Sequence, residues 1–432
     1  MRPESRSFHL KSILFGAFWA SVGILATQHF LGPWLTSYSQ ATEEQILATV
    51  HRTISEDYVE PLSAEALMRN GARGMLESLR DPYADFFGPE DLRRFQEGNS
   101  GVLVGIGVMI NGPGEVLYPQ PGGPAEAAGI RPGDHFLTID GQAVEQMDRG
   151  LMAGLLRGEA GSEVVLEMAH QDGTTFTATV KRSAVPTITV GDVRMVDEAS
   201  GIGHIHIRSF ANSTLAELDH ALERLNRSGM KALILDLRWN PGGQLPSAVG
   251  VAGRFLDGHL VCSLESRYAP TDRRSANSAD GKYFGLPLVL LVNRGSASGS
   301  EVVAAALRER GFAVLVGERT YGKGIYQEVF EYDSGEFAMQ FTAGYYITPA
   351  GHILEGHLNP QLAGGLEPDL SVIPDIEEDR LIRSWQRRNR PPAKYREAME
   401  AAFPETAHLA APPDRFLETA TAVLNRTLLG KP

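Results

Sequence analysis

The feature that most constrains the fold is an alternation of strand-like and helical segments over residues 185–373. Four short apolar runs have the length and composition of buried strands: residues 202–207, 232–237, 288–292 and 313–316. Helical patterns separate them, beginning at Asn212 or Ser213 and ending at Gly229, and over residues 245–255 and 300–310. Repeated strand–helix units predict a layered α/β core.

The segments on either side of this core have a different character. Residues 42–98 show helical spacing, as at Ile46, Val50 and Ile54. Short strand-like runs separated by Gly, Pro and Asp fill residues 99–183 and predict a β-rich domain. The segment 377–432 is charged, helical and interrupted by proline. We therefore expect a helical N-terminal region, a β-rich domain, an α/β core over residues 184–376 and a helical tail.

The N-terminus has the pattern of an export signal. Arg2, Arg6 and Lys11 precede an apolar run over residues 13–26. Residues 39–41 (Ser-Gln-Ala) resemble a small-x-small cleavage site, so the segment 1–41 is either a cleaved signal or a retained membrane anchor. The single cysteine, Cys262, excludes an intramolecular disulfide and is expected in the core. This pattern predicts a bacterial protein of the periplasm or of the outer face of the inner membrane.

Charge and tail composition bear on partners. The net charge is −13, which argues against nucleic acid, because nucleic acid selects basic surfaces. In the tail, the stripe Leu417, Val423, Leu424 and Leu428 is expected to pack within the chain or to form a dimer contact. A homo-oligomer through the helical ends is therefore one expected assembly.

A glycine- and serine-rich turn after the third apolar run is a candidate nucleophile loop. Residues 293–301 read NRGSASGSE and open a predicted helix. Backbone N–H groups and the helix dipole at such a position favour a developing negative charge. Ser298 is the candidate nucleophile. The alternative is an ordinary helix cap, in which Ser298 pairs with Glu301.

A serine nucleophile needs a base, and Lys323 is the best candidate. No histidine follows at a telling position, and Gly-x-Ser-x-Gly is absent. Lys323 lies in an apolar, glycine-rich setting, and holding it neutral at pH 7 costs about 4–5 kcal/mol. Burial away from acids can supply that shift. Gln327 follows four residues later and can orient the amine; the alternative is a surface lysine.

Two further motifs come from strands of the core. Residues 235–243 read LDLRWNPGG, and the N–H groups of Gly242 or Gly243 can form an oxyanion hole with that of Gly299. Gly-Gly is also an ordinary turn. His204 and His206 share one face of a predicted strand, where an exposed strand surface is favoured over a metal site.

Together, LDLRWNPGG, GSASGSE and TYGKGIYQ, in this order, resemble the carboxy-terminal processing (tail-specific) serine peptidases over about residues 42–373. The resemblance implies a crotonase-like spiral ββα core without metal or organic cofactor. It also implies roles for particular residues: Ser298 as nucleophile, Lys323 as general base, Gln327 as the residue that positions the lysine, and Gly242 or Gly243 with Gly299 as oxyanion donors. The chain departs from the family at Gly299, Gly344 and His352, where Ala, Arg and Arg are frequent.

The β-rich segment resembles a PDZ domain. Gly105-Ile106-Gly107-Val108 is similar to the loop that binds a peptide carboxylate, and residues 122–134 are similar to the following helix and turn. Capture of substrate tails by Gly105, Ile106 and Gly107 is favoured over a brace that only regulates the site. Asp81-Pro82-Tyr83 matches a family pattern before this domain and is taken as structural.

These observations predict an exported endopeptidase that cuts envelope proteins near their C-termini. Its partners would be unfolded or C-terminally exposed proteins, with an adaptor protein as a further partner. A non-catalytic binder on the same fold is the alternative, and Ser298, Lys323 and Gln327 together argue against it. A crotonase-type acyl-CoA enzyme is disfavoured, because the export segment removes the chain from cytosolic acyl-CoA.

Overall fold

The computed structural model describes residues 42–430, apart from 101, 113, 187, 333–336, 359–360, 390–392 and 405–411. Contacts divide the chain into two units, one ending at Arg80 and one beginning at Asp81. The predicted apolar segment 13–26 and its cleavage site lie outside the described residues. Over the described ranges, no helix is both long and apolar enough to cross a membrane.

The described part of the first unit, from residue 42 on, contains the helices α3 (Glu43–Asp57) and α4 (Ala64–Ser78). Each begins at a hydroxyl residue whose side chain accepts a backbone N–H, Thr42 for α3 and Ser63 for α4. Several apolar side chains on these helices are exposed, including Ile46, Val50 and Met75.

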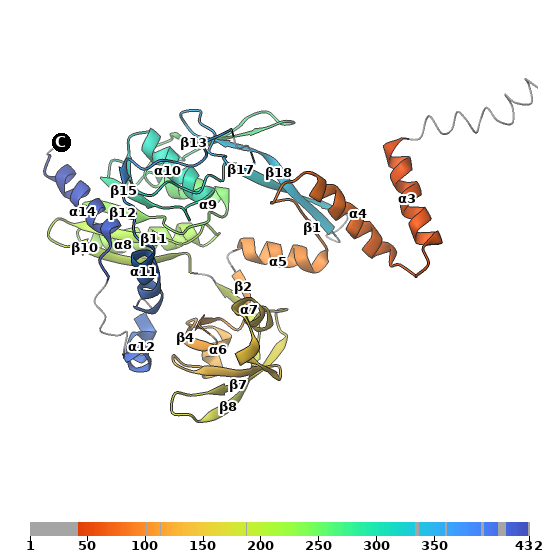
Figure 1. Cartoon of the computed structure of the whole chain (residues 1–432). Helices are drawn as coiled ribbons and strands as arrows, with labels where there is room; N and C mark the ends of the chain where they lie inside the picture. Colours follow the sequence, from red (N-terminus) through yellow and green to blue (C-terminus); the bar gives the residue numbers. More distant parts are fainter. Residues whose placement is uncertain are drawn as a thin grey trace, which may run out of the picture. The chain divides into compact units, whose positions relative to one another are not determined.

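The core of the second unit is a six-stranded sheet (Figure 1). Its strands, in spatial order, are β10 (Val190–Asp197), β11 (Ile202–Ile207), β12 (Ala232–Asp236), β15 (Leu288–Val292), β16 (Ala313–Gly317) and β19 (Leu370–Ser371). All neighbouring pairs are parallel except β10 with β11. Parallel strands buried on both faces require apolar residues throughout, as the sequence pattern indicated.

Helices cover both faces of this sheet. On one face, α8 (Thr214–Arg227), α9 (Leu245–Gly253) and α10 (Gly299–Glu309) pack in the same cluster as Leu233 and Leu235. On the other face, α14 (Arg415–Leu428) packs against Ile234. The predicted tail stripe therefore packs within the chain: Leu424 is buried, whereas Leu428 is 36% exposed.

A second, antiparallel sheet was not predicted from the sequence. It contains β1 (Asp85–Phe87), β13 (Leu260–Ser266), β14 (Asp272–Ser275), β17 (Ile325–Tyr332) and β18 (Phe337–Ile347). Gly344 lies on β18, where a Cβ would stand 2.1 Å from the Glu265 carbonyl oxygen, so the frequent family arginine does not fit here. His352 is exposed and pairs with Glu309.

The β-rich domain has its own apolar core. Its sheet has the order β3 (Val108–Asn111), β4 (Glu115–Pro119), β5 (His135–Ile139), β7 (Glu163–Ala169) and β8 (Thr175–Lys181), with β6 (Gln142–Ala143) beside β5. Helices α6 (Pro124–Ala127) and α7 (Arg149–Leu156) belong to it, and β2 (Val102–Gly105) pairs with β9 (Ser183–Pro186). Strand β3 has β4 as its partner and otherwise forms an edge of the sheet.

The helices outside these layers are α5 (Pro89–Ser100), which precedes the β-rich domain, and α11 (Ile376–Asn389) and α12 (Arg396–Ala402) in the tail. The turn before α12 contacts the β-rich domain, where the Lys394 amine and the Tyr395 hydroxyl both reach the Glu126 carboxylate. Tyr395 also packs against Tyr118.

Two sequence expectations concern single side chains of the core. Cys262 is buried, as expected, and burial raises its pKa to about 12. The histidines of β11 are not on an exposed strand surface, and that expectation was wrong. His204 is fully buried and His206 contacts the Arg238 carbonyl oxygen, because β11 is an interior strand with β10 and β12 beside it.

Candidate active site

Ser298 lies at the turn between β15 and α10, in a strained backbone conformation. Its φ of 53° and ψ of −115° are unusual for a residue with a side chain. The Ser298 N–H donates to the Glu301 carboxylate at 2.8 Å, so the predicted cap partner is present. The side chain is buried and lies close enough to that of Tyr346 to act on its pKa, which burial raises. Strain of this kind is typical of residues held in place for function.

The nucleophile loop is attached to the glycine turn that follows β12. Ser300 donates its hydroxyl to the Asn240 carbonyl oxygen at 2.9 Å, and the Ala297 N–H donates to the same oxygen at 3.0 Å. A Cβ on Gly242 would lie 2.8 Å from the Ser298 Cβ. The glycine at this position therefore allows the two loops to touch beside the nucleophile.

The glycine amides differ in their availability. The Gly242 N–H donates to the Asn240 side-chain oxygen at 2.9 Å, so it is engaged within its own turn. The N–H groups of Gly243 and Gly299 have no acceptor among the residues that the structure describes. These two amides, rather than that of Gly242, are free to bind a ligand oxygen.

Lys323 follows β16 in a loop whose backbone is fixed. Burial lowers the pKa of its amine, while the charges of Asp81 and Glu355 act in the opposite direction. The expected burial is present, but the expected distance from acids is not, because these two carboxylates come from other segments. The amine lies 4.1 Å from the centroid of the Tyr83 ring. Tyr83 therefore lies beside the candidate base, a position that its sequence context did not reveal.

No hydrogen bond joins Ser298 to Lys323 within the described part of the chain. Gln327 lies on β17, and its side-chain nitrogen is buried without a partner among the described residues. A buried amide group without a partner is costly, and such groups are typical of sites that change arrangement during function.

Glu301 connects the two halves of the site, and the sequence reading gave it only a capping role. Its fully buried carboxylate accepts the N–H groups of Ser298, Gly322 and Lys323 and the hydroxyl of Thr320. Burial raises the pKa of Glu301, although the hydrogen bonds that its carboxylate accepts act to lower it. Glu301 thus fixes the Ser298 loop and the Lys323 loop to one another, which a linear motif cannot show.

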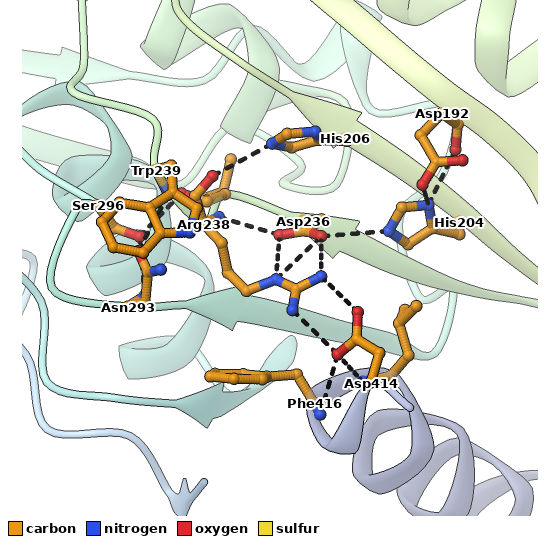
Figure 2. A network of polar contacts seen from close by, with 12 residues as sticks. Asp192, His204, His206, Asp236, Arg238, Trp239, Asn293, Ser296, Asp414 and Phe416 are labelled. Atoms are coloured by element: carbon orange, nitrogen blue, oxygen red, sulfur yellow. Dashed lines mark hydrogen bonds and ion pairs between the residues drawn. The ribbon is translucent and has the colours of Figure 1, made fainter. Parts of the chain in front are cut away.

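A buried network of charges joins Asp236 and Arg238, which precede the glycine turn, to His204 and Asp414 (Figure 2). The Arg238 guanidinium donates to the carboxylates of Asp236 and Asp414, and Asp236 also lies 3.3 Å from the His204 ring. Burial alone would raise the pKa of Asp236, but the charge and hydrogen bonds of Arg238 together with the histidines of β11 outweigh it and hold the pKa well below the usual range. Burial likewise lowers the pKa of His204. Asp414 belongs to the tail, far from Arg238 in sequence.

The predicted carboxylate-binding loop of the β-rich domain lies between β2 and β3. Ile106 is 1% exposed and belongs to the domain core, so this residue can bind a ligand only through its backbone. Gly107 has a φ of 70°, and a Cβ there would stand 3.0 Å from Val185. Gly105 ends β2 and bridges to Arg157.

A serine in a strained turn, amides on its loop and on the adjoining glycine turn that have no acceptor among the described residues, and a lysine with a lowered pKa are the elements that a serine-type peptidase uses. In the described ranges, no group of three or more His, Cys, Asp or Glu side chains is placed to hold a metal ion. Residues 201–372 match the model of peptidase family S41, and residues 115–169 match that of the PDZ domain.

Known proteins identify the family. The carboxy-terminal processing protease CtpA of Bacillus subtilis (strain 168) is 34% identical over 343 residues, which cover 78% of this chain and 72% of that protein. A probable CtpA-like serine protease of Staphylococcus aureus (strain bovine RF122 / ET3-1) is 30% identical over 392 residues, covering 85% of this chain and 74% of that protein. The chain belongs to the carboxy-terminal processing proteases of peptidase family S41 and is a serine-type endopeptidase with a PDZ domain.

A solved structure is also similar to this chain. The photosystem II D1 C-terminal processing protease is 31% identical and matches with a TM-score of 0.48, covering 78% of this chain and 95% of that one.

Proposed function

We propose that this protein is an exported endopeptidase that cleaves envelope proteins near their C-termini with Ser298 as nucleophile and Lys323 as general base. The observation that carries the proposal is the place of Ser298: a strained, nearly buried turn beside the unpaired N–H groups of Gly243 and Gly299. Donors fixed in advance where an oxyanion will form are among the largest contributions to acyl transfer.

The residues suggest a sequence of proton transfers. Neutral Lys323 accepts the Ser298 proton as the serine oxygen attacks the scissile carbonyl. The N–H groups of Gly243 and Gly299 bind the oxyanion of the tetrahedral intermediate. Lys323 then gives the proton to the leaving amine, and water releases the acyl group by the reverse path. Gln327, whose buried side-chain nitrogen has no partner among the described residues, would accept a lysine N–H through its side-chain oxygen in the active arrangement.

The active arrangement requires a movement of the lysine side chain. In this structure the amine lies over the Tyr83 ring, and the Ser298 side chain interacts with that of Tyr346. We infer that this arrangement is a resting one, in which the nucleophile and the base are each held by a tyrosine. Substrate binding would release both, because a peptide at the site displaces the two tyrosine contacts.

The PDZ domain would present the substrate tail. The edge strand β3 can pair with an extended peptide, and the backbone N–H groups of the Ile106–Gly107 turn can hold its terminal carboxylate. A gating role for the same domain would be compatible with the resting arrangement. We also propose the finer expectations: a crotonase-like spiral core with helical ends, export by residues 1–41 to the periplasm or the outer face of the inner membrane, an adaptor protein and a homo-oligomer as partners, and no cofactor.

The test uses the full chain and an unfolded protein substrate. Wild-type protein should cleave it, and Ser298→Ala should hold it uncleaved, so that proteins trapped from envelope extracts can be identified. The same substrate with an amidated C-terminus should be cut more slowly if the PDZ domain binds the carboxylate. Equal rates would exclude carboxylate capture, and tight binding without cleavage by the wild type would favour the non-catalytic binder.

A further inference from the structure

We propose that Asp414, at the start of the C-terminal helix α14, is a positioning residue for the oxyanion loop and acts on it through Arg238. The inference rests on the oxyanion role proposed above for Gly243 and Gly299. It gives the tail a part in catalysis, although the tail lies outside the residues that match the peptidase family model.

The first step is the contact itself. The two terminal nitrogens of Arg238 donate to the two carboxylate oxygens of Asp414, each at 3.0 Å. The other side of the guanidinium donates to Asp236, at 2.7–3.1 Å. The side chains of Arg238 and Asp414 are 5% and 11% exposed. A two-point contact of this kind fixes both distance and orientation, and in a dry setting it is poorly replaced by water.

The second step leads from Arg238 to the amides. Arg238 is followed by Trp239, which has a φ of 62°, and then by Asn240, whose side chain binds the Gly242 N–H. A displaced guanidinium would therefore move a short, strained turn that ends at Gly243. Figure 2 shows the Arg238 guanidinium between Asp236 and Asp414, with Trp239 to the left near Asn293 and Ser296.

The third step concerns the other end of the contact. Asp414 also accepts the N–H groups of Phe416 and Leu417 at 3.2 Å, so its carboxylate caps α14 while it pairs with Arg238. The Phe416 ring lies 4.9 Å from the guanidinium and is buried against the sheet. Helix α14 is thus packed on the sheet. Asp414, at its start, holds the Arg238 guanidinium in place, and through it the loop that ends at Gly243.

A second tail helix contacts the same turn. The Arg383 guanidinium of α11 lies 4.0 Å from the centroid of the Trp239 ring, and Arg294 of the nucleophile loop lies 5.0 Å from it. Arg294 also pairs with Asp379 of α11. Two tail helices therefore hold the turn from outside the peptidase core.

The experiment compares Asp414→Asn with two controls on the same helix. Leu424→Ala removes packing against the sheet, and Asn425→Ala removes the hydrogen bond to Asp197; neither residue contacts Arg238. The readouts are kcat and KM on an unfolded substrate, the rate of Ser298 labelling by a fluorophosphonate, and thermal unfolding. Asp414→Asn should lower kcat about 10- to 100-fold with little change in KM, and should slow labelling in parallel, because the labelled adduct uses the same amides.

The remaining variants separate positioning from folding. Leu424→Ala should lower the unfolding temperature but keep kcat, and Asp414→Glu should restore part of the lost kcat. Equal loss of kcat in Asp414→Asn and Leu424→Ala at equal stability would overturn the inference, as would an Asp414→Asn protein with wild-type kcat. A wild type that neither cleaves nor labels would overturn the proposed function itself, and the inference with it.

Discussion

The loop that carries Ser298 and the loop that carries Lys323 are held in different ways. Around Ser298, the backbone and the neighbouring hydroxyls of Ser296 and Ser300 make buried hydrogen bonds to the strand β12 and its glycine turn. Around Lys323, the backbone is fixed by Glu301, but the amine lies over an aromatic ring, and the amide nitrogen of Gln327 has no partner in the described part of the chain. The backbone around the proposed nucleophile is thus held in place, whereas the side chain of the proposed base is adjustable.

This difference in how the two loops are held suggests that a regulator could move the lysine side chain at a smaller free-energy cost than the serine turn. Moving the serine turn would break several buried hydrogen bonds, each of which leaves a buried polar group unpaired at about 1–3 kcal/mol. Moving the lysine amine exchanges one cation–π contact, worth about 0.5–2 kcal/mol, for a hydrogen bond to Gln327. A regulator that acts on the lysine side therefore needs far less energy.

The largest expected effect on activity comes from replacing either Ser298 or Lys323. Ser298→Ala and Lys323→Ala should each lower kcat/KM for an unfolded protein by about 10⁴-fold or more, because both act in the same step. The exposed Lys231→Ala is a matched control and should have wild-type activity. Substantial cleavage by Lys323→Ala would show that another group is the base, and the comparison of the two loops would lose its basis.

The next effect concerns the link between the loops. Glu301→Gln replaces an acceptor of four hydrogen bonds by a group that is partly a donor, so the free energy of unfolding should fall by about 2–4 kcal/mol. It should also lower kcat about 10- to 100-fold, since both catalytic loops shift.

The matched control for this link is Glu309→Gln at the other end of α10. Glu309 accepts hydrogen bonds from Thr348 and Ala350, away from the site. Denaturant unfolding and steady-state kinetics on both variants make the test. If Glu309→Gln lowered kcat as much as Glu301→Gln, general destabilisation of the helix would explain both results.

A smaller effect is expected in the pH dependence. Burial lowers the pKa of Lys323, and catalysis needs its neutral form. Activity should therefore rise about tenfold per pH unit below this pKa and level off above it, with a midpoint below the ordinary lysine value of about 10.4. A rate profile of kcat/KM from pH 5 to 10 checks this. A profile that falls over the same range would point to a group that must be protonated.

The smallest effect is expected from the ring beneath the lysine. A cation over an aromatic face is stabilised in its charged form, so Tyr83 raises the pKa of Lys323. Tyr83→Leu should move the midpoint of the profile down by about half a pH unit. Tyr83→Phe keeps the ring and should leave the midpoint nearly unchanged. Identical shifts in both variants would mean that the hydroxyl, not the ring, acts on the lysine.

The core of the fold could be predicted because its strands are apolar throughout. β11, β12 and β15 are buried on both faces, and such runs are visible without knowledge of their neighbours. The sheet of β13, β17 and β18 was missed, because its strands are only partly buried and mix polar with apolar residues. The histidines of β11 were misplaced for a related reason: burial of a polar side chain depends on partners such as Asp236 that come from other strands.

The sequence by itself determined the chemistry that is available: a serine in a small-residue turn that opens a helix, a lysine in a glycine-rich loop and a glycine turn after a buried strand. These are local properties, since turn and cap preferences depend on a few neighbouring residues. Only the tertiary structure decided which described amides lack an acceptor, which acids lie near Lys323, that Glu301 joins the two loops, that Tyr83 lies beside Lys323 and that Asp414 pairs with Arg238. Those facts depend on contacts between segments far apart in the chain, and charge and hydrogen bonding act over ångströms of space, not over positions in a sequence.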